Sequence, residues 1–152
     1  SLISGRNADL LIGRHVEAAP SIKQSGLEVI PTGYILIDGG KATSVSYMSN
    51  TTPIPSDKSD IAVATALAGE LLGLKVIYLE AGSGAKNPVS SEIISRVSNA
   101  VDIPIIVGGG IRSVEQVERA FESGANVVVI GTAVERDSEL ISMIAATMKN
   151  FA

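Results

Sequence analysis

Short apolar runs recur along the chain, separated by longer stretches in which polar and apolar residues mix. Four of the runs are almost continuously apolar and rich in β-branched residues, as strands buried on both faces of a sheet are. They cover residues 34–37, 76–79, 104–107 and 127–130. The alternation of such runs with helical stretches predicts an α/β protein built on a parallel sheet.

The stretches between these runs carry helical patterns of differing strength. Residues 56–72 place apolar side chains at the spacing of one helix face. Asn87-Pro88 predicts the start of another helix, because asparagine is a good N-cap and proline suits the first helical position. Residues 9–23 also indicate a helix, which we expect to break near Pro20. Weak alternation over residues 41–49 predicts a short hairpin extension of the first strand.

Composition and charge narrow the class of protein. The 152 residues fit one domain, and the 45% that are hydrophobic are enough to fill a core. The chain has no cysteine, which excludes disulfides and cysteine chemistry and suits a reducing, cytoplasmic location. The net charge of −4, without a basic cluster, argues against a nucleic-acid partner. The longest apolar stretch, residues 61–79, is interrupted by Glu70 and Lys75 and therefore does not predict a membrane span.

Two strand ends carry a pattern that is typical of phosphate binding. Gly109 and Gly110 lie in a glycine triplet between the third strand and the next helix, and Gly131 and Thr132 occupy the same place after the fourth strand. Glycines let the backbone approach a ligand, and helix N-termini offer it unpaired N–H groups. Glycines that only make tight turns are the alternative. Two consecutive corners of this kind favour the phosphate site of a (β/α)8 barrel.

The second apolar run ends on a carboxylate. Tyr78 and Glu80 share one face of the predicted strand, whereas Ile77 and Leu79 share the other. A polar residue at the carboxyl end of a barrel strand indicates catalysis, and Glu80 there is suited to orient or deprotonate a substrate hydroxyl. The alternative is a carboxylate that caps a loop or pairs with a neighbouring cation. The small-residue loop that follows, next to a predicted phosphate site, favours the catalytic interpretation.

Several segments together resemble one known family. They are YLEAGSGA (78–85), VGGGIRS (107–113), VVVIGTAV (127–134), IPTGYI (30–35) and LIGRHVEAAP (11–20). These segments, spread over nearly the whole chain, resemble the geranylgeranylglyceryl phosphate synthase family, which includes archaeal enzymes and bacterial prenylglyceryl phosphate synthases. The first segment is the most specific of the five.

The resemblance implies an activity and a set of residues for it. It implies a prenyltransferase that joins sn-glycerol 1-phosphate to a polyprenyl diphosphate of the geranylgeranyl type, forming the first ether bond of a membrane lipid and releasing diphosphate. Glu80, with Tyr78 beside it, takes the catalytic role. The implied substrate-binding residues are Tyr34, Tyr78, Leu79, Glu80, Ala81, Gly82, Ser83, Gly84, Gly109, Gly110, Gly131 and Thr132.

The resemblance also implies that this chain is the C-terminal part of a (β/α)8 TIM-barrel-type domain. Residues 1–152 would form a single unit that runs from the end of strand 4 through helix 8. The family's Mg²⁺ is expected as a cofactor on the diphosphate, but its strand 1 aspartate lies in the βα units that are absent, so this chain supplies no metal ligand. Asp38 is better interpreted as a turn residue. The open sheet edges that result predict self-association or pairing with the missing half-barrel.

Two other functions remain open from the sequence. One is another phosphate-binding barrel enzyme, such as an isomerase or synthase acting on a sugar phosphate, which predicts a second catalytic acid or a lysine at other strand ends. The other is an inactive half-barrel that binds phosphate or only assembles.

Overall fold

The predicted strands form one parallel sheet. The structure, a computed structural model, describes residues 1–148. Within these residues the strands lie side by side in chain order, β1-β2-β3-β4. They are β1 (Thr32–Leu36), β2 (Val76–Glu80), β3 (Ile105–Gly108) and β4 (Val127–Val129). Each parallel neighbour requires a crossover, and α3 (Ser59–Leu71), α4 (Ser91–Ser98) and α5 (Val114–Glu122) provide them. The predicted α/β fold with a parallel sheet is confirmed.

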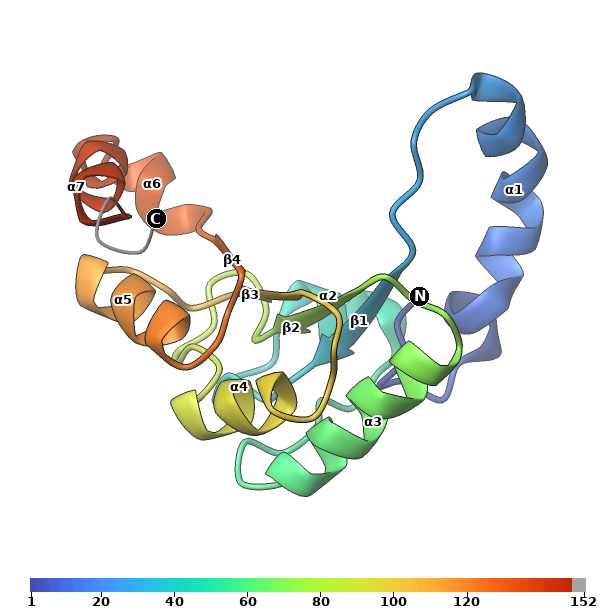
Figure 1. The fold of residues 1–152 in the computed structure, drawn as a ribbon, viewed down its shortest axis with the longest axis horizontal. Coiled ribbons are helices and arrows are strands. Elements are labelled where there is room, and N and C mark those ends of the chain that lie inside the picture. Colours follow the sequence, from blue (N-terminus) through green and yellow to red (C-terminus); the bar gives the residue numbers. More distant parts are fainter. Residues whose placement is uncertain (149–152) are drawn as a thin grey trace.

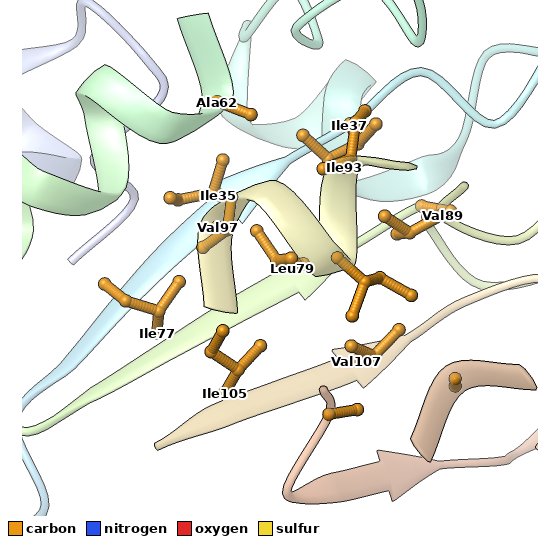
Figure 2. Close-up of a cluster of buried hydrophobic side chains, with 14 of the residues drawn as sticks. Ile35, Ile37, Ala62, Ile77, Leu79, Val89, Ile93, Val97, Ile105 and Val107 are labelled. Carbon is orange, nitrogen blue, oxygen red and sulfur yellow. The ribbon is translucent and has the colours of Figure 1, made fainter. Parts of the chain in front are cut away.

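These three helices cover one face of the sheet (Figure 1). Strand residues Ile77, Leu79 and Ile105 point towards Ile93 and Val97 of α4, and all five side chains are buried (Figure 2). Burying one such side chain contributes roughly 1.5–3 kcal/mol. This layer between sheet and helices is therefore the core of the described chain.

On the opposite face of the sheet, residues from the four strands line up in regular rows. Tyr34, Tyr78, Ile106 and Val127 are partners across the sheet, and Leu36, Glu80, Gly108 and Val129 form the next row towards the carboxyl ends. This face is poorly covered within residues 1–148, because Val127 and Val129 are 46% and 42% exposed. Parallel sheets usually have both faces covered. The face that carries Glu80 is therefore the open one.

The N-terminal residues pair with the outer edge of β1. Tyr34 donates its N–H to the carbonyl of Ser1 (2.7 Å), and Ile3 donates to the carbonyl of Tyr34 (2.9 Å). The bridge between Leu2 and Tyr34 is parallel. Residues 1–4 thus occupy a strand-like position beside β1.

The next segment projects away from the sheet (Figure 1). It consists of the π-helical turn η1 (Asp9–Gly13) and α1 (Arg14–Ser25), which buries no residue. The predicted break at Pro20 is wrong, because the helix runs through it. The carbonyl that loses its partner to the proline belongs to Val16, which is 67% exposed, so water can hydrate it.

Two local predictions are also wrong. Residues 41–49 contain the helix α2 (Ser44–Ser49), not a hairpin, because Thr43 and Ser46 form a capping box in which the Thr43 N–H donates to Ser46 Oγ (3.0 Å). Helix α4 begins after Ser90, whose Oγ accepts the Ile93 N–H (3.3 Å), and not at Asn87-Pro88. Asn87 instead donates its N–H to the carbonyl of Gly39 (2.9 Å) within the loops.

Two further helices follow β4. They are α6 (Thr132–Arg136) and α7 (Glu139–Met148), and α7 packs against α5. No helix within residues 1–148 combines the length and apolar character needed to cross a membrane.

Candidate functional site

A cavity of about 660 Å³ opens at the carboxyl ends of β2, β3 and β4. The loops that follow these strands meet there, as they must in a parallel sheet. Most of the predicted site residues line this cavity: Tyr78, Glu80, Ser83, Gly84, Gly109, Gly110, Gly131 and Thr132. The structure therefore brings the predicted catalytic acid and both predicted phosphate-binding corners to one place.

Four of the predicted residues lie outside the lining of this cavity. Leu79 and Ala81 are buried in the core. Gly82 lies behind the cavity wall, where its backbone contacts Glu80. Tyr34 packs against Tyr78, with the two ring centroids 5.1 Å apart. Tyr34 is therefore placed to support Tyr78.

Glu80 is held in a fixed orientation at the cavity. Its side chain is buried, and Oε1 accepts the backbone N–H of Gly82 (2.7 Å). Gly82 adopts a positive φ of 96°, and a Cβ there would lie 2.5 Å from the Thr43 side chain. Only glycine therefore fits this turn. The carboxylate stabilises its own loop, as the structural alternative predicted, and also lines the cavity.

The two tyrosines beside Glu80 remain protonated. Burial raises the pKa of Tyr78 well above its usual range, and the negative charge and hydrogen bonding of Glu80 raise it further. Burial and the charge of Glu80 also raise the pKa of Tyr34. The Tyr78 hydroxyl is therefore a hydrogen-bond donor next to an acceptor carboxylate.

Gly108 leaves room for this pair. It lies beside Glu80 in the sheet register. A Cβ on Gly108 would lie 2.5 Å from the Tyr78 hydroxyl oxygen and 2.8 Å from Glu80 Oε2. The sequence analysis assigned functions only to the later glycines of the triplet. The signal for Gly108 was its position at the end of β3, level with Glu80.

Arg112 joins the two loops that follow β2 and β3. Its Nη1 donates to the carbonyls of Lys86 (3.0 Å) and Gly110 (3.3 Å), and its Nη2 donates to the carbonyl of Ala85. The sequence analysis did not single out this residue. The planar guanidinium bonds several carbonyls at once and so fixes the shape of the cavity wall.

Positive charge gathers at this cavity. Within residues 1–148, the cationic side chains that line it are Lys41, Arg112 and Arg136. Glu80 is the carboxylate among the lining residues. The cavity is thus suited to a small anionic ligand that also presents a group to Glu80.

Comparison with known sequences agrees with this geometry. A sequence model described as the PcrB family matches residues 1–149. The chain belongs to the PcrB family. Among the relatives of this PcrB-family chain, a geranylgeranylglyceryl phosphate synthase of Chitinophaga pinensis is 59% identical over 145 residues, and one of Spirosoma linguale is 56% identical over 151 residues. The resemblance inferred from the sequence motifs is confirmed.

A solved structure gives the same answer for the fold. The geranylgeranylglyceryl phosphate synthase of Thermoplasma acidophilum, in complex with its substrate sn-glycerol-1-phosphate, matches 99% of this PcrB-family chain with a TM-score of 0.92 and 33% identity. The α/β architecture is therefore shared with that protein.

The chain spans only part of these relatives. The match to the Chitinophaga protein includes 95% of this chain and 58% of the relative. For the Spirosoma protein the two shares are 99% and 61%, and for the Thermoplasma structure they are 99% and 61%. The chain thus spans about three fifths of the length of the relatives it matches.

Residues 1–148 do not provide a complete set of protein ligands for the expected Mg²⁺. They contain no group of three or more His, Cys, Asp or Glu side chains placed to hold a metal ion. Glu80 already accepts the Gly82 N–H, and Mg²⁺ is usually held by carboxylates together with water and phosphates. The described part of this PcrB-family chain does not fit a metal centre of its own.

Proposed function

We propose that this PcrB-family chain carries the glycerol-phosphate part of the active site of a prenyltransferase. The reaction joins sn-glycerol 1-phosphate to a polyprenyl diphosphate of the geranylgeranyl type. The observation that carries the proposal is that Glu80 and Tyr78 open into the same cavity as the two glycine-rich corners. The names of the relatives and the substrate in the Thermoplasma structure support it.

The phosphate is proposed to lie against the loops that consist mainly of glycine and other small residues. Ser83 and Gly84 follow β2, Gly109 and Gly110 follow β3, and Gly131 with Thr132 follows β4. Backbone N–H groups in such loops bind phosphate oxygens. With its phosphate there, the ligand extends its hydroxyl end towards Glu80.

The chemistry proposed for Glu80 is general-base catalysis. The 3-hydroxyl oxygen of glycerol phosphate attacks C1 of the prenyl chain, and its proton passes to the Glu80 carboxylate. The new C–O bond forms as the bond from C1 to the diphosphate oxygen breaks, and diphosphate leaves with the electron pair. Tyr78, held protonated, donates a hydrogen bond that orients Glu80 or the reacting hydroxyl.

The expectation of Mg²⁺ stays a prediction. The ion would neutralise the leaving diphosphate when bound. Since residues 1–148 offer it no ligand set, we assign no step of the reaction to it.

We further propose that residues 1–152 are one unit, the C-terminal part of a (β/α)8 barrel. Three observations support this. The strands are parallel and in chain order, their crossover helices cover one face, and residues 1–4 pair beside β1 as the end of a preceding strand would. The additional length of the relatives is the proposed source of the remaining strands.

Replacement of Glu80 by glutamine tests the proposed reaction. In the full-length protein, assayed with labelled sn-glycerol 1-phosphate and geranylgeranyl diphosphate, Glu80→Gln is expected to lower kcat by about 10²–10⁴-fold, because the amide cannot accept the proton. Binding of glycerol phosphate is expected to persist.

Glu122→Gln is the matched control, since Glu122 is exposed at the end of α5. Unchanged turnover in Glu80→Gln would exclude Glu80 as the base. Absence of turnover in the wild-type protein would instead favour a sugar-phosphate enzyme or an inactive, phosphate-binding half-barrel.

A further inference from the structure

The cavity contains the negative charge of Glu80 and is proposed to bind a ligand whose phosphate is also negatively charged. Glu80 lines it, and a phosphate monoester carries about 1.5 to 2 negative charges near pH 7. The N–H groups of the glycine loops supply only partial positive charges. A cationic side chain beside the phosphate is therefore needed to offset the repulsion between ligand and carboxylate.

Arg112 is already committed to another task. Both of its terminal nitrogens donate to backbone carbonyls, those of Ala85, Lys86 and Gly110. These bonds join two loops and hold the guanidinium plane against the backbone. Arg112 shapes the cavity wall, so a cation that is not bonded to the backbone is better placed to turn towards a phosphate.

A hydrogen-bonded turn places Lys41 beside the loop that contains Ser83 and Gly84. The Gly40 N–H donates to Asp38 Oδ1 (2.8 Å), which confirms Asp38 as a turn residue. Gly39, which precedes Gly40, packs closely against the loop after β2. A Cβ on Gly39 would lie 2.5 Å from the Cβ atom of Ala85. The loop that carries Lys41 therefore lies directly against the loop that follows β2.

The Lys41 ammonium is free to take a ligand. Its Nζ lies 3.8 Å from the point where a Cβ on Gly84 would be. The salt bridges within residues 1–148 involve other cations, so no carboxylate there neutralises Lys41. A lysine is a compact charge on a flexible stem, and this suits a phosphate whose orientation the backbone already fixes.

Arg136 is the other cation to compare. It reaches the cavity from α6, after β4, whereas Lys41 reaches it from the loop after β1. Since β1 is the sheet neighbour of β2, Lys41 is the cation adjacent to the Ser83–Gly84 loop. Arg136 lies on the helix that follows β4, the strand at the other edge of the sheet.

We propose that Lys41 binds the phosphate of the glycerol-phosphate ligand directly and determines the affinity of the site for phosphorylated ligands. This inference rests on the proposed function. Lys41 extends the proposed site to a fourth loop, so the phosphate is held by loops that follow β1, β2, β3 and β4.

Calorimetric titration of the full-length protein with sn-glycerol 1-phosphate and with inorganic phosphate tests this inference. Lys41→Ala is expected to weaken binding of both ligands about tenfold or more, because it removes a charge-assisted contact. Lys41→Arg keeps the charge and is expected to stay within roughly threefold of wild type. Lys75→Ala is the matched control, since Lys75 is exposed and precedes the amino end of β2.

The outcomes separate this inference from the proposed function. If wild-type protein binds glycerol phosphate and Lys41→Ala binds it equally well, the role of Lys41 is disproved while the proposed function stands. Loss of affinity in Arg136→Ala but not in Lys41→Ala assigns the contact to Arg136 and likewise overturns the inference. If wild-type protein binds neither ligand, the proposed function fails and the role of Lys41 fails with it.

Discussion

Gly108 decides how closely β3 approaches the proposed catalytic pair. It is level with Glu80 in the register, and the space that its side chain would fill is occupied by the Tyr78 hydroxyl and Glu80 Oε2. Both atoms belong to side chains held by other contacts, so neither can move without disturbing the site. Gly108 thus contributes to the site by having no side chain.

A methyl group at this position is expected to displace the pair. Gly108→Ala should lower kcat about 10²-fold, since a misplacement near 1 Å has an effect of that size. The prenyltransferase assay measures this, and circular dichroism checks that the fold persists. Gly13→Ala is the control, because the atoms nearest to its methyl would belong to the exposed Asp9 side chain. Activity retained in Gly108→Ala would show that the pair tolerates the shift.

Single residues differ in how far the sequence could predict their position at the cavity. Glu80 and the paired glycines were predictable, because their place at strand ends alone brings them to one edge of the sheet. Lys41 and Arg112 were not, because the direction of a long side chain depends on loop contacts. Arg112 is turned by three carbonyls, and Lys41 is turned by a packed glycine turn.

At the scale of elements, the strands were predictable and the loop segments were less so. Runs of β-branched residues favour strands, and every predicted run became one. The expected burial on both faces is wrong for β4, where Val127 and Val129 are exposed among the described residues. The signals for residues 41–49 and Asn87-Pro88 were weaker. The capping box of Thr43 and Ser46 stabilises a helix in residues 41–49. The hydrogen bond from the Asn87 N–H to the Gly39 carbonyl holds Asn87 in a loop.

The hydrogen bonds of Arg112 to the carbonyls of Ala85, Lys86 and Gly110 form a clamp that joins the loops after β2 and β3. Arg112→Ala removes charge-assisted bonds to carbonyls in both loops, so each should open more often. Hydrogen exchange is expected to become about tenfold faster across residues 82–87 and 108–111, and KM for glycerol phosphate should rise more than kcat falls. Arg112→Lys should restore only part of the protection, since it cannot span the same carbonyls.

Arg119→Ala provides the comparison for this measurement. Arg119 lies on α5, and its Nε donates to the carbonyl of Glu115 on the same helix. Its removal should leave exchange in the two loops unchanged. Equal exchange rates in wild type and Arg112→Ala would mean that the loops hold their shape without the clamp.

At the scale of the whole molecule, the sheet has one covered face and one open face. The helices α3, α4 and α5 bury the first (Figure 1). On the second, Val127 and Val129 remain exposed among the described residues, and the outer edge of β4 has no neighbouring strand there. An uncovered apolar face and a free edge both favour association. The same face carries Tyr78 and Glu80, so we expect the segment that covers it to border the proposed site as well.

Residues 1–152 produced alone are therefore expected to associate through this face. Sedimentation velocity should show species larger than a monomer at micromolar concentration. Val129→Lys should shift the population towards monomer, because a charge on the exposed edge strand of this face is costly to bury. Glu122→Gln changes the net charge by the same amount on the helical side and should leave association unchanged. A cooperatively folded wild-type monomer would contradict the pairing of half-barrels, and would mean that the open face is stable in water.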